Sequence, residues 1–213
     1  TLAALCNLAR ELYISISIGS LAVKTNDADG RFANRSFWIN PMGEIIGQYD
    51  KIHMFDVQIS EAETYRESAG YRPGKKAVVA ETALGKVGMA ICYDMRFPLL
   101  ANALAQAGSE ILLYPAAFSP ITGAAHWHSL LRSRAIETGC YVIAAAQTGT
   151  HPTSGPKARS TYGHSLVVDP WGKVILDAGM DAGVYAFEIE MKNVARARQK
   201  VPSLLNARPF EAP

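Results

Sequence analysis

The sequence has few cysteines and no paired cysteine motif. Its three cysteines, Cys6, Cys92 and Cys140, are an odd number at wide spacing, and no CxxC pair is present. We therefore expect neither a disulfide framework nor a zinc ribbon nor a thioredoxin-type dithiol, and a reducing cytoplasm is the compartment that fits this pattern best.

The sequence also lacks a strong charge of either sign and a long apolar run. Charged residues make up 19% of the 213 residues and the formal net charge is +2, with no basic run, so no nucleic-acid partner is expected. No apolar stretch reaches the roughly 18 residues that cross a bilayer, so no membrane partner is expected either. A hydrophobic content of 49% is enough for the core of one domain, which we assign to residues 1–213.

Apolar strands alternate with helical segments along the chain, which is the pattern of an α/β protein. Helical spacing predicts helices, and β-branched or continuous apolar runs predict strands. The expected helices cover residues 2–11, 95–109, 124–139 and 191–200. The expected strands lie at 13–21, 35–40, 43–51, on both sides of 83–85, and at 110–118, 140–147, 163–169, 173–178 and 184–190. The expected loops cover residues 24–33, 60–76 and 148–160.

Cys92 is the candidate nucleophile. It follows a buried strand and precedes the polar residues Tyr93, Asp94 and Arg96. In an open α/β sheet, functional groups gather beyond the carboxyl ends of the strands. A helix start close by would lower the pKa of the thiol and favour the thiolate. The alternative is a small, buried and inert side chain, which is the common state of a free cysteine.

Several motifs resemble those of the nitrilase superfamily of carbon–nitrogen hydrolases. The segment "GKVGMAICYDMRFP" resembles its nucleophile motif, "YDKIHMFD" its lysine motif, and "YRES" followed by "RPG" its second-glutamate segment. The segments "YPAAFSPITGAAHWHSLLRSRAIETGCYVIAAAQ" and "YGHSLVVDPWG" are similar to it in order and spacing. The resemblance extends over essentially the whole chain and is strongest to the amidase branch that acts on deaminated glutathione, with the ω-amidases next.

The resemblance implies an αββα four-layer sandwich and hydrolysis of an amide bond in a small, carboxylate-bearing substrate. Thiolate attack would release ammonia and leave a thioester that water hydrolyses. Other amidases of the superfamily, such as those acting on N-carbamoyl or aliphatic substrates, are alternatives. Acyl transfer to a thiol needs no electron sink, so no cofactor is expected.

The resemblance also assigns the remaining catalytic roles. Lys51 would stabilise the tetrahedral oxyanion together with the backbone N–H of Tyr93, and Glu67 would orient the lysine and the proton relay. From the residues alone, a solvated surface charge is the favoured interpretation of Lys51, and Glu67 would be an ordinary surface glutamate. Glu61 and Glu63 lie in the same expected loop but off the motif, and we interpret them as solvated.

The superfamily's general-base glutamate has no counterpart in this chain. That residue belongs at the end of a strand preceding the helix that opens the sequence. The expectation is therefore an N-terminally incomplete nitrilase-like domain that lacks its first strand–helix–strand unit and is inactive in this form. The alternative is an inactive nitrilase-like binding subunit.

Three residues are candidates for substrate binding. By resemblance, Arg96 would clamp a substrate carboxylate, with Phe118 and Thr122 beside it. A salt bridge between Asp94 and Arg96 is the alternative interpretation of Arg96. A cysteine protease is a weaker possibility, because it would require a histidine within reach of Cys92.

The last two expectations concern a metal site and self-association. His126 and His128 are two positions apart on an expected helix, so they point in different directions, and no metal site is expected. The related enzymes pair through a helical layer, so we expect a homodimer or a higher homo-oligomer. Residues 124–139 and the tail after Lys200 are the expected contact segments.

Overall fold

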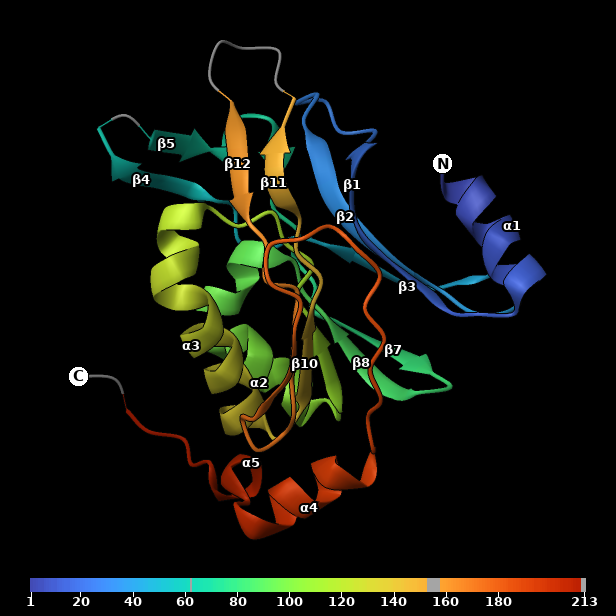
Figure 1. Ribbon diagram of the computed structural model, residues 1–213, viewed down its shortest axis with the longest axis vertical. Coiled ribbons are helices and arrows are strands. Elements are labelled where there is room, and N and C mark those ends of the chain that lie inside the picture. The colour runs from blue at the N-terminus through green and yellow to red at the C-terminus, as the bar shows by residue number, and fades with distance from the viewer. Residues whose placement is uncertain (62, 153–157, 212–213) are drawn as a thin grey trace.

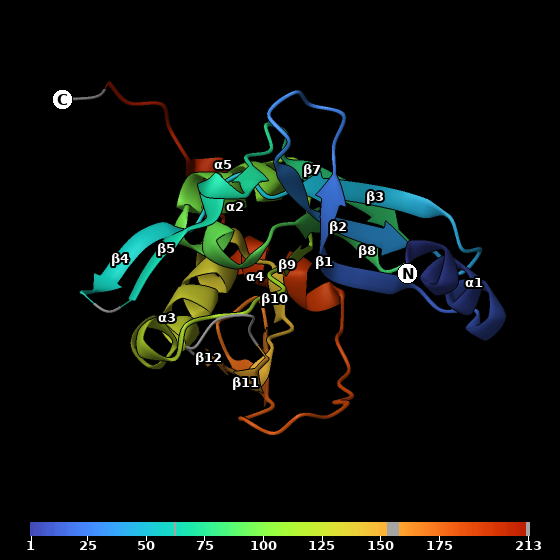
Figure 2. The ribbon, with the colours of Figure 1, turned by 90° about the horizontal axis from the view of Figure 1, so that it is seen from above.

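The computed structural model describes residues 1–61, 63–152 and 158–211. Two β-sheets lie face to face; two helices pack on the outer face of one, and the N-terminal helix lies against one end of the outer face of the other (Figures 1 and 2). The helices are α1 (Leu2–Leu12), α2 (Pro98–Gln106), α3 (Pro120–Thr138), α4 (Lys192–Lys200) and α5 (Ser203–Asn206). None of the described helices is long and apolar enough to cross a membrane.

The first sheet has the strand order β1–β2–β3, and β6 pairs with β2. Its strands are β1 (Ile16–Lys24), β2 (Phe32–Ile39), β3 (Ile45–Asp50) and β6 (Tyr71–Arg72). Side chains alternate between the two faces of a strand, and β2 follows this rule. Phe37 and Ile39 pack against α1, whereas Trp38 between them packs against the second sheet.

The second sheet has the order β14–β13–β10–β9–β8–β7. Its strands are β7 (Val78–Thr82), β8 (Gly85–Met89), β9 (Ile111–Leu113), β10 (Tyr141–Ala144), β13 (Leu166–Val168) and β14 (Val174–Asp177). The central strands β8, β9 and β10 are parallel. Their side chains pack on one face against α2 and α3 and on the other against the first sheet. The layers are therefore α, β, β and α, which confirms the expected sandwich.

Most expected elements are present, and proline and glycine mark the helix ends where expected. Pro98 occupies the first turn of α2, and Gly139 ends α3 in the left-handed conformation with φ +61°. These positions suit proline, whose missing N–H has no helical partner there, and glycine, which has no Cβ to clash.

Three expectations about the chain are wrong. Residues 60–76 are not an irregular loop, because β4 (Asp56–Ser60) and β5 (Glu63–Arg66) form a hairpin that a 3₁₀ turn and β6 follow. The expected loop at 148–160 is also a hairpin, of β11 (Thr148–His151) and β12 (Arg159–Tyr162), although residues 153–157 lie outside the described part. The expected strand at 184–190 has no partner in either sheet and runs along the surface to α4.

Candidate active site

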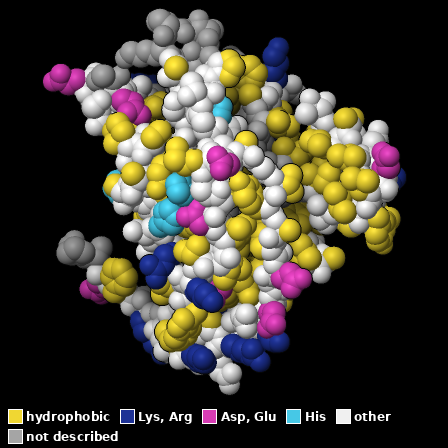
Figure 3. Space-filling view, viewed as in Figure 1, with side chains coloured by type: hydrophobic (Ala, Val, Ile, Leu, Met, Phe, Trp, Pro, Cys, Tyr) yellow, Lys and Arg dark blue, Asp and Glu magenta, His cyan; other side chains and the backbone are white. Residues whose placement is uncertain are grey.

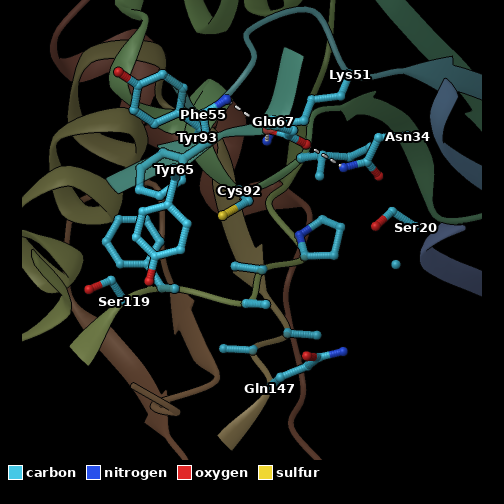
Figure 4. A pocket seen from close by; sticks show the side chains of 18 of the residues that line it. Ser20, Asn34, Lys51, Phe55, Tyr65, Glu67, Cys92, Tyr93, Ser119 and Gln147 are labelled. Atoms are coloured by element: carbon cyan, nitrogen blue, oxygen red, sulfur yellow. Dashed lines mark hydrogen bonds and ion pairs between the residues drawn. The ribbon is translucent and has the colours of Figure 1, made fainter. Parts of the chain in front are cut away.

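Cys92 lies in a tight turn directly beyond the carboxyl end of β8. Its backbone has φ +48°, a left-handed conformation that is rare for a residue with a side chain. The turn is held by hydrogen bonds from the Cys92 N–H to the Pro115 carbonyl (2.9 Å) and from the Asp94 N–H to the Ile91 carbonyl (3.1 Å). This backbone places the thiol in a cavity of about 880 Å³ (Figure 4).

Lys51 and Glu67 lie in the same cavity as Cys92. Lys51 Nζ is 2.5 Å from Glu67 Oε2, and the lysine side chain is only 3% exposed. The carboxylate also accepts hydrogen bonds from Asn34 Nδ2 (2.9 Å) and from the Phe55 N–H (2.7 Å). Figure 4 shows this pair close to the Cys92 side chain. Neither charge is therefore a solvated surface group.

Asp94 connects the cysteine turn to the lysine segment, a role that the sequence patterns did not indicate. It is 0% exposed and accepts a hydrogen bond from the Tyr49 hydroxyl (2.7 Å) and one from the Ile91 N–H (2.9 Å). Its other oxygen contacts both the N–H (3.1 Å) and Nδ1 (2.7 Å) of His53. Since Tyr49 and His53 flank Lys51, Asp94 sets the position of the lysine relative to Cys92.

The pKa of the Cys92 thiol is raised above its ordinary value, because burial disfavours the thiolate. The Lys51 ammonium and a backbone hydrogen bond from Ala117 act in the opposite direction but do not outweigh burial, to which Glu67 and Asp94 add. The expectation of a lowered pKa is therefore wrong. Cys92 is followed by a short 3₁₀ turn, and α2 begins only at Pro98. A thiol in this state needs a base to remove its proton.

The Tyr93 backbone N–H is available as a hydrogen-bond donor beside the thiol. In the described part of the chain it has no hydrogen-bond acceptor. The Tyr93 ring packs edge-on against Phe55 at 5.0 Å and against Phe97 at 5.3 Å. The ring contacts hold the turn in place while the N–H stays unpaired.

The substrate-binding expectations are met in part. Phe118 and Thr122 line the cavity, and Thr122 Oγ1 is buried with no hydrogen-bond partner among the described residues. Arg96 is not among the residues that line the cavity, contrary to expectation. Its guanidinium lies over the Phe118 ring (5.5 Å) and contacts His126 Nδ1 (3.3 Å). The alternative salt bridge between Asp94 and Arg96 is also absent, since other partners fill both Asp94 oxygens.

Other polar residues of the cavity were not expected. Tyr65, Ser119, Gln147, Arg66 and Arg159 line it. Glu63, which we expected to be solvated, accepts hydrogen bonds from the Tyr65 hydroxyl (2.8 Å) and from Ser119 Oγ (3.0 Å). Glu63, Tyr65, Arg66 and Arg159 lie on hairpins that we expected to be loops, so no periodicity pointed to them, whereas Ser119 and Gln147 directly precede α3 and β11.

No histidine is among the described residues that line the cavity, which removes the support for a cysteine protease. The cavity instead combines a thiol with a buried ion pair, between the layers of an αββα sandwich.

Comparison with known proteins identifies the family. The carbon–nitrogen hydrolase family profile matches residues 1–199. The deaminated glutathione amidase of Mus musculus is 44% identical over 205 residues, covering 95% of this chain and 62% of the relative. That of Yersinia enterocolitica is 41% identical and covers 94% of this chain and 69% of the relative. The chain belongs to the carbon–nitrogen hydrolase family, and it spans about 62% of the length of the mouse relative.

Solved structures agree with this assignment. The C. elegans NitFhit protein aligns with TM-score 0.86 and 37% identity over 97% of this chain and 50% of its own. Saccharomyces cerevisiae Nit3, a member of branch 10 of the nitrilase superfamily, aligns with TM-score 0.82 and 34% identity over 94% of this chain and 69% of its own. The fold is therefore that of the nitrilase superfamily.

Proposed function

We propose that the chain carries the nucleophile and oxyanion site of an amidase that acts on a small carboxylate-bearing amide. The observation that supports this most directly is the cavity that holds Cys92, Lys51 and Glu67 together. Deaminated glutathione is the first substrate to test, because relatives of that name match over most of the chain. An ω-amide such as α-ketoglutaramate is the second.

In the proposed reaction the Cys92 sulfur attacks the amide carbon, and the carbonyl oxygen becomes an oxyanion. The Lys51 ammonium and the Tyr93 N–H stabilise that charge, and Glu67 holds the lysine in place. Collapse of the intermediate breaks the C–N bond, releases ammonia and leaves a thioester on Cys92. Water then hydrolyses the thioester and restores the thiol.

The reaction needs a general base, and the cavity does not offer a free one. Among the described residues that line it, Glu67 is the single carboxylate, and it is paired with Lys51. We propose that the base is a glutamate of a strand–helix–strand unit preceding Thr1, in the place that the family resemblance assigns to it. Such a base contributes typically about 10²–10⁴-fold to the rate.

The substrate carboxylate has two candidate partners in this cavity. Arg66 and Arg159 both line it, whereas Arg96 lies against the outer side of Phe118. We propose that Arg96 supports the Phe118 wall and that Thr122 Oγ1 donates to the substrate. Substitution of Arg159 by glutamine should then raise KM for a carboxylate-bearing amide more than for a neutral one.

The test measures ammonia release from deaminated glutathione and from α-ketoglutaramate. The 213-residue chain is compared with a version extended upstream through one further strand–helix–strand unit. We expect turnover in the extended version alone, lost on Cys92→Ser and on substitution of its upstream glutamate by glutamine, and retained in the matched control Cys6→Ser.

Equal turnover by both versions would show that a residue of this chain is the base. Failure of the folded, extended version to release ammonia from either amide would favour the inactive binding subunit.

We also propose a homo-oligomer in a reducing cytoplasm. The three cysteines are free, and Ile121 and Ile136 of α3 are exposed, as are Leu205 and Phe210 in the C-terminal segment. Pairing through α3 and this segment would cover that apolar surface. A stable monomer by light scattering at micromolar concentration would contradict the oligomer.

A further inference from the structure

A second cluster of titratable side chains lies away from the Cys92 cavity. It consists of His128 in α3, His164 just before β13, and Asp177 at the end of β14. His128 Nε2 is 2.8 Å from Asp177 Oδ2, and His164 Nδ1 is 2.9 Å from Asp177 Oδ1. None of the three lines the Cys92 cavity. The face in Figure 3 shows histidine side chains directly beside a carboxylate on the open surface.

The backbone around the cluster is held by its own contacts. His164 has φ +55°, its carbonyl accepts a hydrogen bond from Trp127 Nε1 (2.8 Å), and its N–H donates to the Gly179 carbonyl (2.6 Å). The Tyr162 ring stacks on the His164 ring at 4.5 Å. The Gly179 N–H donates to Asp177 Oδ1 at 2.9 Å. The three side chains therefore converge from three packed segments.

We propose that His128, His164 and Asp177 form a binding site for a divalent transition-metal ion, with Zn²⁺ as the best-suited ion. One ligand atom from each residue lies within 4.8 Å of the others. Two imidazole nitrogens and one carboxylate oxygen are ligands that zinc accepts, at about 2.0–2.2 Å, with a water in the fourth position. Ligand atoms on such a tetrahedron are roughly 3.3 Å apart, so small side-chain rotations would close the site.

The charge and exposure of the cluster suit an ion that enters from solvent. The side chains of His128, His164 and Asp177 are 36%, 23% and 33% exposed. The Asp177 carboxylate is contacted by the Gly179 N–H and by both imidazoles, and it is the one carboxylate ligand of the set. On coordination, a proton on His128 Nε2 or His164 Nδ1 moves to the other ring nitrogen or to solvent.

The histidine spacing did not reveal this site, because its ligands come from three separate segments. His126 and His128 do point apart, as expected: His126 contacts Arg96, whereas His128 contacts Asp177. His126 therefore offers a matched control two positions earlier on the same helix. The site is separate from the proposed amidase chemistry and does not depend on it.

The test titrates Zn²⁺ into chelator-treated protein by calorimetry and Co²⁺ by visible absorption. We expect one ion per chain, tetrahedral cobalt bands without a thiolate charge-transfer band, and a rise in Tm with added zinc. His128→Ala and Asp177→Asn should each weaken zinc affinity by at least about tenfold. His126→Ala and Cys92→Ser should leave it unchanged.

Asp177→Asn keeps the size of the side chain, so it tests the site even where His128→Ala fails to fold. Three outcomes would overturn the proposal: no saturable binding to the folded protein, equal affinity in Asp177→Asn, or loss of binding in Cys92→Ser.

Discussion

Two cysteines of this chain, Cys92 and Cys140, have similar electrostatic surroundings and different access. Burial raises the pKa of both thiols, and each lies near a cation that opposes this effect, Lys51 for Cys92 and Arg198 for Cys140. Cys140 is completely buried, its sulfur 3.2 Å from the Ser109 carbonyl and 3.1 Å from Arg198 Nη2. Cys92 instead borders the cavity.

The difference follows from the direction of the parallel strands. Cys92 comes after the carboxyl end of β8, whereas Cys140 comes just before the amino end of β10. The carboxyl ends of parallel strands meet at the edge where the sheet leaves room for a ligand. At the opposite edge, α4 brings Arg198 onto the Cys140 sulfur and closes the space. A nearby cation is therefore no sign of a nucleophile unless the thiol also opens to a cavity.

The largest expected effect is the loss of the carboxylate that holds the Cys92 turn. Asp94→Ala leaves the buried donors of Tyr49 and Ile91, and the half-buried donors of His53, without their acceptor. We expect the free energy of unfolding in urea to fall by about 3–5 kcal/mol. The control Glu81→Ala removes an exposed carboxylate and should change it by less than about 0.5 kcal/mol. An equally small change in Asp94→Ala would contradict the role given to this residue.

The next effect concerns the two charges near Cys92, which should act in opposite directions. Lys51 lowers the pKa of the thiol and Glu67 raises it. Lys51→Gln should therefore raise this pKa and slow alkylation of Cys92 at neutral pH, and Glu67→Gln should lower the pKa and speed alkylation. In each variant, the alkylation rate at neutral pH should change by about tenfold for every unit by which the thiol pKa shifts.

The measurement is the alkylation rate as a function of pH, with Arg198→Gln as the control near the other cysteine. This control should leave the Cys92 profile unchanged. Shifts of the same sign in Lys51→Gln and Glu67→Gln would show that the pair does not set the thiol's charge.

A smaller effect is expected beside Cys140. Gly139 has φ +61°, and a Cβ there would lie 2.8 Å from the Arg198 side chain. Gly139→Ala should lower the free energy of unfolding by about 1–2 kcal/mol, because alanine resists this conformation. Gly70 has an ordinary φ and open space around it, so Gly70→Ala is the control with no loss of stability. Thermal unfolding of both variants measures the loss of stability, and alkylation of both should give the same Cys92 labelling rate, because Gly139 lies beside Cys140 and not at the cavity.

Much of the fold was predictable because it depends on local patterns. The apolar runs of β8, β9 and β10 and the helical spacing of α1, α3 and α4 predicted these elements at nearly their observed positions. The family motifs predicted that Cys92, Lys51 and Glu67 belong to one site, and all three line one cavity. The local sequence around Lys51 and Glu67 alone would have predicted two exposed surface charges.

The remaining features depend on contacts between distant segments. The four hydrogen bonds of Asp94 come from Tyr49, Ile91 and His53, and a lone aspartate after a cysteine gives no sign of them. The strands of the β4–β5 and β11–β12 hairpins have four or five residues each and are mostly polar, and only β4 alternates apolar and polar residues, through Val57 and Ile59. Arg96 turns toward His126 and Phe118, which only the packing of α3 decides.

The most direct test of the account is competitive labelling of the two thiols. The protein, with Cys6→Ser to remove the third cysteine, is treated with limiting iodoacetamide, and the peptides are mapped by mass. We expect label on Cys92 first, at a rate that keeps rising with pH beyond the ordinary thiol pKa of about 8.5, and on Cys140 only after unfolding. Preferential labelling of Cys140 in the folded protein would contradict the assignment of Cys92 as the accessible nucleophile.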